Sequence, residues 1–311
     1  MMKVEIRDAK SDKILYTFPE VPNNGTTLTV KKEIHNKDRK MYIARQSLRS
    51  SPTGRALNDD RILEDMCSSG DAHKLCLYLR DLGPQIGWRT VFLVEYIGPL
   101  VIYFIIWLLR QPELRLTFLT PITTLRGLRN LAVACWCGHY AKRLLETIFV
   151  HRFSHATMPM KNLFKNCTYY FGFAAFVAYF VNHPLYTSPA FGCKQICFGL
   201  GVFLLSEYGN LCCHLALRNL RPPGSTVRRI PQPVPGRFLT RLFTLVACPH
   251  YTYEVMSWIG FAIMTQSLPV ALFAAAGFGQ MSLWALSKLK AYRRDFPEFP
   301  RRRRAIVPFV L

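Results

Sequence analysis

Acidic residues are scarce in this sequence. Its 311 residues include 19 Asp and Glu against 40 Lys and Arg, a formal net charge of +21, and 50% of the residues are hydrophobic. Apolar mass with an excess of basic residues is typical of a membrane protein beside an anionic lipid surface. Nucleic-acid binding is the alternative. However, the basic residues stand between long apolar stretches and form no compact basic domain, so we expect no nucleic-acid partner.

Several motifs that would identify a soluble enzyme or a metalloprotein are missing. The ten cysteines form no CxxC pair and most of them lie in apolar stretches, so we expect neither a metal site nor a disulfide framework. No P-loop, HExxH or GxSxG string occurs. The nearest string to a dinucleotide fingerprint, at residues 277–282, lies inside an apolar stretch with no strand before it. Any dinucleotide must therefore be held by membrane helices and loops.

Residues 1–82 differ from the rest of the chain because they are largely polar and their apolar residues alternate. Alternation is typical of strands with one buried face. The predicted order is strand, strand, helix, strand, strand, at Lys3–Arg7, Ile14–Phe18, Thr27–Asn36, Ser47–Arg49 and Lys74–Arg80. This order resembles a ubiquitin-like β-grasp fold. No catalytic constellation appears in it, so we expect a cytosolic structural or docking domain.

Residues 83–311 predict a multi-pass α-helical membrane domain with six or seven transmembrane helices. Val91–Leu109 has Glu95 as its only charged residue, and its 19 residues would span roughly 28 Å as a helix, about one hydrocarbon thickness. Of the six stretches the third, 169–182, is short, and the fifth, 238–264, carries a polar cluster and could hold a broken helix. The stretches after the first are 128–150, 169–182, 195–217, 238–264 and 267–288.

The distribution of charge gives this membrane domain an orientation. With six helices, the loops on the amino-terminal side hold most of the basic residues, including Arg152, Arg237 and the run 301–304. The opposite loops hold few. By the positive-inside rule, both termini lie in the cytosol.

This orientation predicts that neither of two glycosylation sequons is used. Asn24 begins the string Asn-Gly-Thr and Asn166 begins Asn-Cys-Thr, and both fall on the cytosolic side of the predicted topology. Endoglycosidase treatment of the protein from microsomes should therefore leave its electrophoretic mobility unchanged. A band that shifts on treatment would overturn the topology.

A stripe of polar residues runs along the fourth apolar stretch and past its end. Asn210, His214, Arg218 and Arg221 recur at spacings of four, four and three, which places them on one face of a helix. Arginine suits bidentate contact with phosphate, and a Pro-Pro-Gly string turns the chain directly afterwards. The alternative is that such arginines extend to lipid headgroups. That alternative suits Arg229 but does not explain Asn210 or His214, so the stripe indicates a cavity for a phosphate-bearing cofactor.

The fifth stretch holds His250, Tyr251 and Glu254. Tyr251 and Glu254 are three residues apart and share a helix face. A phenol can give a proton to a developing carbanion, and a carboxylate accepts hydrogen bonds from an amide or a ribose. The alternative is an aromatic belt at the membrane interface, but such a belt requires no acid.

Ionisable residues also interrupt the first two stretches. Glu95 lies in the first, where an acid near the helix centre costs roughly 2.5–3.5 kcal/mol, so a pairing or a substrate contact must offset it. His139, Tyr140 and Lys142 lie together in the second. With the fourth and fifth stretches, these residues predict a polar cavity surrounded by helices.

Several strings resemble one known family along essentially the whole chain. Those at residues 217–221, 229–231, 250–254, 299–300 and 308–309 resemble the carboxy-terminal domain of the steroid 5-alpha-reductases. Those at residues 45–49, 151–155, 165–170 and 251–255, with the ubiquitin-like segment, are similar to the very-long-chain trans-2-enoyl-CoA reductase branch of that family. The sequence is therefore identified as a member of this branch.

The resemblance implies an activity and a place in the cell. It implies NADPH as the reductant and a long-chain trans-2-enoyl-CoA as the substrate, in the last step of very-long-chain fatty-acid elongation at the endoplasmic-reticulum membrane. Hydride would go to the β-carbon and a proton to the α-carbon. Other fatty-acid elongation enzymes are candidate partners.

The resemblance also assigns roles to residues by position. Tyr251 matches the proposed proton donor, Lys142 is a further catalytic candidate, and Glu95 and Tyr140 match a substrate-side pair. The positions that match cofactor contacts are Asn210, Arg218, Arg221, Arg229, Glu254 and Tyr292.

Two cofactor-binding candidates depart from the family pattern. His250 stands where relatives commonly carry Asn, and a neutral imidazole can likewise donate to and accept from a carboxamide. His214 stands where steroid reductases have an acid, which favours an acyl-CoA over a steroid as substrate.

Two other functions fit the sequence. A sterol or polyprenol double-bond reductase would use the same chemistry, so only substrate assays separate it from an enoyl-CoA reductase. A non-catalytic membrane adaptor would recruit partners through the ubiquitin-like domain and would make no demand on Tyr251.

Overall fold

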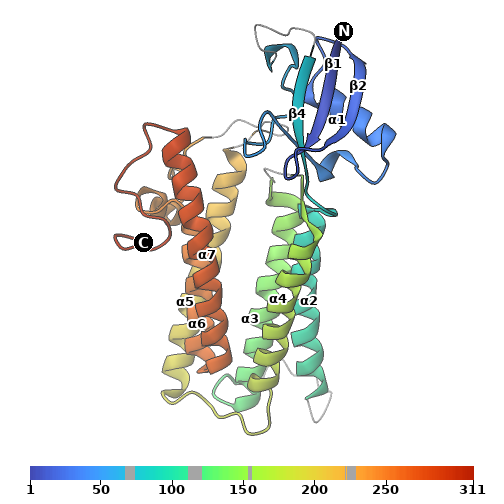
Figure 1. Cartoon of the computed structure of the whole chain (residues 1–311). Helices are drawn as coiled ribbons and strands as arrows, with labels where there is room; N and C mark the ends of the chain where they lie inside the picture. The colour runs from blue at the N-terminus through green and yellow to red at the C-terminus, as the bar shows by residue number, and fades with distance from the viewer. Residues whose placement is uncertain (67–73, 111–120, 153–155, 221, 223–228) are drawn as a thin grey trace. The chain divides into compact units, whose positions relative to one another are not determined.

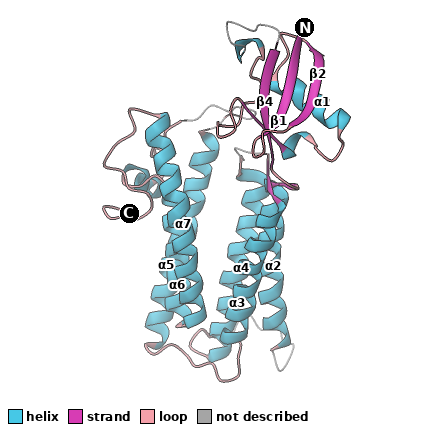
Figure 2. Ribbon diagram, viewed as in Figure 1, coloured by secondary structure: helices cyan, strands magenta, loops and turns pink. Residues whose placement is uncertain are grey.

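The chain divides into two compact units. One comprises residues 1–88 and 155–163, and the other comprises residues 89–154 and 164–311. The computed structural model describes residues 1–66, 74–110, 121–152, 156–220, 222 and 229–311. All the strands in the described residues lie in the first unit, and the second is built from long helices (Figures 1 and 2).

The first unit contains a four-stranded sheet with one helix. The strand order is β2-β1-β4-β3, with β1 and β4 parallel and the two outer pairs antiparallel. Val4 and Ile6 on β1 pack against Val30 and Ile34, which lie one helical turn apart on α1. The predicted β-grasp fold is therefore confirmed. The elements are β1 (Met2–Asp8), β2 (Ile14–Val21), α1 (Thr27–Lys37), β3 (Gln46–Arg49) and β4 (Lys74–Asp81), with 3-10 turns at Ile43–Arg45 and Glu64–Met66.

An ion pair joins the segment before β3 to the end of β4. The Arg45 guanidinium donates to both carboxylate oxygens of Asp81, at 2.6 Å each. These hydrogen bonds favour the charged carboxylate and hold the pKa of Asp81 below its ordinary value. Arg45 opens one of the strings that carry the family resemblance, and in the structure its role is to fasten the sheet.

A second, very short strand pair was not predicted. β5 (Gln85–Gly87) pairs antiparallel with β6 (Thr157–Pro159), directly before the helices α2 and α4 begin. Three-residue strands carry too little alternation to be read from a sequence.

Six long helices account for most of the second unit. Of the described helices, α2, α5 and α7 are long and apolar enough to cross a membrane. The chain is therefore a largely helical membrane protein, whereas a count of six or seven crossings is not confirmed. The helices are α2 (Trp88–Leu109), α3 (Leu125–Leu145), α4 (Met160–Val181), α5 (Gly192–Asn219), α6 (Pro249–Thr265) and α7 (Leu268–Asp295).

Two boundaries differ from the predicted stretches, and a third stretch is broken. α4 begins at Met160 and has 22 residues, so the prediction of a short stretch was wrong. Its first turns are polar, and a search for apolar residues therefore missed them. α3 gives way to a π-helical turn at Glu146–Val150, a distortion that is frequent at functional sites. The fifth stretch is broken as expected: a 3-10 helix, Phe238–Thr244, ends before Pro249 starts α6. Proline suits the first position of a helix, because the N–H group of that residue has no partner within the helix and its absence costs no hydrogen bond.

α5 and α6 approach each other closely through two glycines. A Cβ on Gly199 would lie 2.5 Å from the backbone nitrogen of Met264, and a Cβ on Gly260 would lie 2.6 Å from that of Phe203. Small residues at such crossings allow backbone-to-backbone contact in membranes. The crossing fixes the distance between α5 and α6, two of the helices that carry the candidate site.

The C-terminal residues return to the start of α6. The backbone nitrogen of Ala247 donates to the carbonyl of Arg304 at 2.8 Å, and that of Cys248 donates to Ala305 at 3.1 Å. The Thr252 hydroxyl donates to the carbonyl of Ile306 at 2.6 Å. This return holds the break before α6 in one conformation.

The glycine crossing predicts opposite effects for two Gly→Ala substitutions. Gly260→Ala should lower the free energy of unfolding by about 1–3 kcal/mol, because the added methyl group forces the backbones apart. Gly201→Ala is the matched control on α5: its Cβ would meet nothing within 4 Å, so stability should stay the same or rise slightly. Thermal unfolding in detergent measures both. Equal losses in the two variants would contradict the close crossing.

Candidate functional site

Polar side chains form facing rows on α3 and α5. On each helix they recur at spacings of three or four residues, so each row occupies one helix face. Four of them, His139, Glu146, Asn210 and His214, are buried, and the others are partly buried. With the carboxylate of α6 that joins them, we call this set the polar ladder: His139, Lys142, Arg143 and Glu146 from α3 and its π-helical end, Glu207, Asn210 and His214 from α5, and Glu254 from α6.

The first contacts of the ladder centre on Glu207. Its carboxylate lies 2.8 Å from Nδ1 of His139 and 2.8 Å from Nζ of Lys142. The Lys142 ammonium also donates to the side-chain oxygen of Asn210 at 2.8 Å. Lys142 is thus held between two groups of α5.

The next contacts centre on Arg143 and Glu146. The Arg143 guanidinium donates to the Glu146 carboxylate at 2.7 Å and to the hydroxyl of Tyr96, on α2, at 2.8 Å. Nδ1 of His214 lies 3.0 Å from the same Glu146 oxygen. The ladder therefore also fastens α2.

α6 joins the ladder through Glu254. One carboxylate oxygen lies 3.2 Å from Nε2 of His139, and the other accepts from the side-chain nitrogen of Asn210 at 3.1 Å. That nitrogen also donates to the backbone oxygen of His250 at 2.9 Å. Both ring nitrogens of His139 face carboxylates, which only accept, so the imidazolium is the form that donates at both positions.

Three polar groups beside the ladder have no partner among the described residues. Tyr140 is 1% exposed and its hydroxyl makes no hydrogen bond. Nδ1 of His250 is likewise buried and unpaired. The ring of Tyr251 lies 4.2 Å from that of His250, and its hydroxyl has no protein partner in the described structure. Buried polar atoms are almost always hydrogen-bonded, so the atoms of Tyr140 and His250 indicate where a ligand would bind, and the partly buried Tyr251 lies beside the second of them.

Glu95 lies apart from the ladder. It is 2% exposed, and its carboxylate accepts from the side-chain nitrogen of Asn166 at 2.8 Å. No hydrogen bond joins it to Tyr140 in the described residues, although the ring of neighbouring Tyr96 lies 6.2 Å from the Tyr140 ring. The same contact occupies the amide nitrogen of the second sequon.

The remaining predicted cofactor residues are not members of the polar ladder, and two of them contact other residues in the described part of the chain. Arg218 lies in the last turn of α5, and its backbone oxygen accepts from Arg152 at 3.0 Å. The ring of Tyr292 stacks on Phe299 at 5.4 Å. Arg229 is exposed. Arg221 lies outside the described residues.

A group of three side chains with the donor atoms for a metal ion shares two residues with the polar ladder. Glu146, His151 and His214 offer ligand atoms within 4.8 Å of one another. The Arg143 guanidinium already lies 2.7 Å from Glu146 and 3.3 Å from His214. A metal ion would be repelled by that charge at contact distance, so the ion-pair arrangement accounts for the group.

Glu146 and Glu207 were missed by sequence reasoning. Both are isolated acids next to or within an apolar stretch, the signal that singled out Glu95. Applied throughout, that rule finds both acids, although it does not name their partners.

Comparison with known proteins gives one consistent result. Residues 156–311 match the family described as 3-oxo-5-alpha-steroid 4-dehydrogenase, and residues 2–81 match the domain described as TECR, ubiquitin-like domain. A probable very-long-chain enoyl-CoA reductase of Caenorhabditis elegans is 50% identical over 309 residues, 99% of each chain. The very-long-chain enoyl-CoA reductase of Dictyostelium discoideum is 40% identical over 318 residues and 100% of both chains. The trans-2,3-enoyl-CoA reductase-like protein of Homo sapiens is 40% identical over 313 residues, 99% of this chain and 84% of its own.

The ladder predicts strong energetic coupling between His139 and Glu207. Glu207→Ala should lower the free energy of unfolding by about 3–5 kcal/mol, because it leaves buried cations without their partner. In a double-mutant cycle with His139→Ala, the coupling energy should reach about 1–3 kcal/mol. The same cycle between His139 and the exposed Glu298, outside the ladder, should give a value near zero. Additive losses for His139 and Glu207 would show that their contact contributes nothing.

Proposed function

Because the chain belongs to the family of very-long-chain enoyl-CoA reductases, it is an oxidoreductase that acts on a carbon–carbon double bond, and we propose that it reduces long-chain trans-2-enoyl-CoA to saturated acyl-CoA. The β-carbon receives a hydride and the α-carbon a proton, which balances the reaction. This is the last step of very-long-chain fatty-acid elongation.

NADPH is the reductant in this proposal, and when bound it supplies the hydride from its nicotinamide ring. Residues at the start of α6 fit that ring. The unpaired Nδ1 of His250, the amide of Asn210 and the carboxylate of Glu254 offer a donor and acceptors for a carboxamide and a ribose. His214 lies next to them, with its ring 5.7 Å from that of His250.

Arginines near the end of α5 would hold the phosphates of the cofactor. Arg218 is half-buried in the last turn of that helix, and within the described part of the chain no carboxylate lies within 4.0 Å of its guanidinium. A guanidinium without an acidic partner is available for bidentate contact with phosphate. Arg221 and Arg229 follow Arg218 in the chain, and Tyr292 packs in the same apolar cluster as Tyr251.

Tyr251 donates the proton to the α-carbon. Its hydroxyl is not used by the described protein, whereas the ammonium of Lys142 is held by Glu207 and Asn210. A side chain held in two strong contacts suits positioning, so Lys142 orients Asn210 and Tyr251 acts as the acid. The unpaired hydroxyl of Tyr140 is the donor for the thioester oxygen, on which negative charge develops.

Glu95 completes the substrate side of the proposal. Its contact with Asn166 leaves the second carboxylate oxygen for a polar group of the substrate. The observation that carries the whole proposal is that Tyr140 and His250, each adjacent to a histidine of the polar ladder, both hold a buried polar atom without a partner among the described residues.

One observation favours a second function. The match of residues 156–311 to the 3-oxo-5-alpha-steroid 4-dehydrogenase family is compatible with reduction of a sterol or polyprenol double bond. Steroid reductases have an acid at the position of His214. In this chain the carboxylate of Glu146 lies 3.0 Å from His214 and supplies an acid at nearly the same place. Assays with both substrate classes separate these functions.

The proposal places the enzyme in the endoplasmic-reticulum membrane with α2–α7 crossing it and both termini in the cytosol. The basic loops then face the anionic leaflet and the CoA headgroup. The ubiquitin-like domain stands on the cytosolic side, where other elongation enzymes are candidate partners.

Replacing the proposed acid tests the assignment. Detergent-purified wild-type protein should oxidise NADPH when a long-chain trans-2-enoyl-CoA is added. Tyr251→Phe should lower kcat by about 100-fold or more while NADPH binding, followed by fluorescence, stays unchanged, because only the proton is removed.

Tyr253→Phe is the matched control on the same helix. The Tyr253 hydroxyl donates to the backbone oxygen of Leu239 at 2.9 Å, away from the ladder, so kcat should stay within a few-fold of wild type. Full activity in Tyr251→Phe would assign the proton to another donor. Wild-type protein that never oxidises NADPH would favour the adaptor function.

A further inference from the structure

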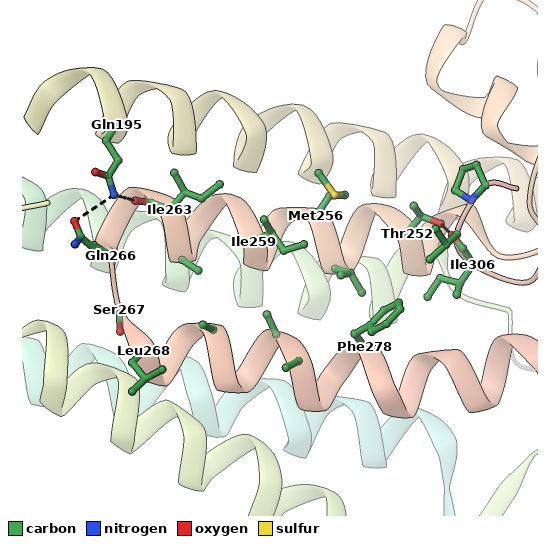
Figure 3. A pocket seen from close by; sticks show the side chains of 17 residues that line it. Gln195, Thr252, Met256, Ile259, Ile263, Gln266, Ser267, Leu268, Phe278 and Ile306 are labelled. Carbon is green, nitrogen blue, oxygen red and sulfur yellow. Dashed lines mark hydrogen bonds between the residues drawn. The ribbon is translucent and has the colours of Figure 1, made fainter. Parts of the chain in front are cut away.

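A large cavity lies between α6 and α7, on the face of α6 turned away from Glu254. Its volume is about 870 Å³. Figure 3 shows the side chains along it, from Thr252 and Ile306 at one end to Gln195 and Gln266 at the other. Met256 and Ile259, between the ends, are 39% and 37% exposed, so the cavity is a groove open at the side.

The polar residues of the groove stand only at its ends. Thr252 is bonded to the carbonyl of Ile306 at one end. At the other, the Gln195 amide donates to the carbonyl of Ile263 at 2.9 Å and faces Gln266 at 3.4 Å. The wall between the ends is apolar. Such a lining suits a hydrocarbon chain and offers nothing to a polar ligand.

The groove is long and narrow. Thr252 and Gln266 are fourteen residues apart on α6, which corresponds to roughly 21 Å along the helix axis. On α7 the middle of the opposite wall is made by small residues, Ala271, Ala274 and Ala275, where larger side chains would fill the space, and Leu268 and Phe278 stand at its ends. This shape fits an extended chain better than a compact ring system.

One end of the groove lies in the apolar cluster that contains the proposed proton donor, although Tyr251 itself does not line the groove. Val255 and Ile306 line the groove, and both pack in one apolar cluster with Tyr251. A thioester held at Tyr251 would therefore have an apolar path beginning beside it. An acyl chain on that path would run along the length of α6.

We propose that this groove holds the acyl chain of the substrate, with the thioester end at Thr252 and the methyl end toward Gln266. The proposal rests on the enoyl-CoA reductase function and adds the site that determines which lengths of acyl chain the enzyme prefers. α6 and α7 are joined at Gln266 and Ser267 and run antiparallel, so Phe278 lies near the reacting end, Ala275 lies midway and Ala271 lies near the far end.

Tryptophan substitutions along α7 test the groove at two depths. Each methylene that loses its apolar contact should weaken binding about fourfold. Ala275→Trp should therefore lower the ratio of kcat/KM for trans-2-hexadecenoyl-CoA to that for crotonyl-CoA by about tenfold or more. Ala271→Trp should lower the same ratio less, because it closes only the far end.

Leu272→Trp is the matched control. Leu272 is 48% exposed on the same helix but does not line the groove, so its substitution should leave the ratio unchanged. If both alanine variants reduce the two substrates with the wild-type ratio, the groove holds bilayer lipid and the proposal is overturned. Wild-type protein that reduces neither substrate contradicts the enzyme function itself and not the groove.

A labelling experiment on wild-type protein avoids any folding defect of the variants. A trans-2-enoyl-CoA with a diazirine at its methyl end should label residues between Ile263 and Ala271. Labelling confined to α2, α3 or α4 would place the acyl chain elsewhere and overturn the proposal.

Discussion

Buried charge is the constraint on which the helical unit depends. Glu146, Glu207 and Glu254 lie inside a membrane protein, where each acid is expensive unless it is paired. Their partners come from other helices, so the pairs form in only one register of α3 against α5 and α6. A shift of one residue along any of these helices would rotate its row by about 100° and break every contact at once. The ladder therefore specifies the arrangement as well as stabilising it.

Backbone contacts supply what the ladder does not. The Gly199–Gly260 crossing sets the separation of α5 and α6, and the returning C-terminal residues hold the turn before Pro249. Arg303, which is 4% exposed, donates to the carbonyl of Pro231 at 2.8 Å and to the Gln232 side chain at 2.8 Å. The loop that precedes α6 is thus fastened from the far end of the chain.

Part of this could be read from the sequence because the relevant signals are local. The alternation of apolar and polar residues in residues 1–82 predicted the β-grasp strands. The spacing of four residues between Asn210 and His214 predicted that both lie on one face of α5. The break in the fifth stretch followed from its polar cluster. These features depend on residues close together in the chain.

The rest depends on residues that are distant in sequence. Nothing near Glu207 names His139 or Lys142 as its partners, and nothing near Arg303 indicates Pro231. The polar first turns of α4 made the helix look shorter in the sequence than it is. β5 and β6 have three residues each, too few to show the alternation of apolar and polar residues that is typical of a strand. The groove between α6 and α7 arises from the absence of large side chains at Ala271 and Ala275, which composition alone does not reveal.

The broken fifth stretch also has an electrostatic consequence. Because α6 begins at Pro249, Tyr251 occupies its first turn, where aligned peptide dipoles place about half a unit of positive charge. In the proposed reaction Tyr251 would give up its proton there and be left as a phenolate beside that charge. An unbroken helix would have put the same residue in mid-helix, far from the dipole end, so the interruption that orients the side chain also lowers the cost of its anionic state until a new proton arrives.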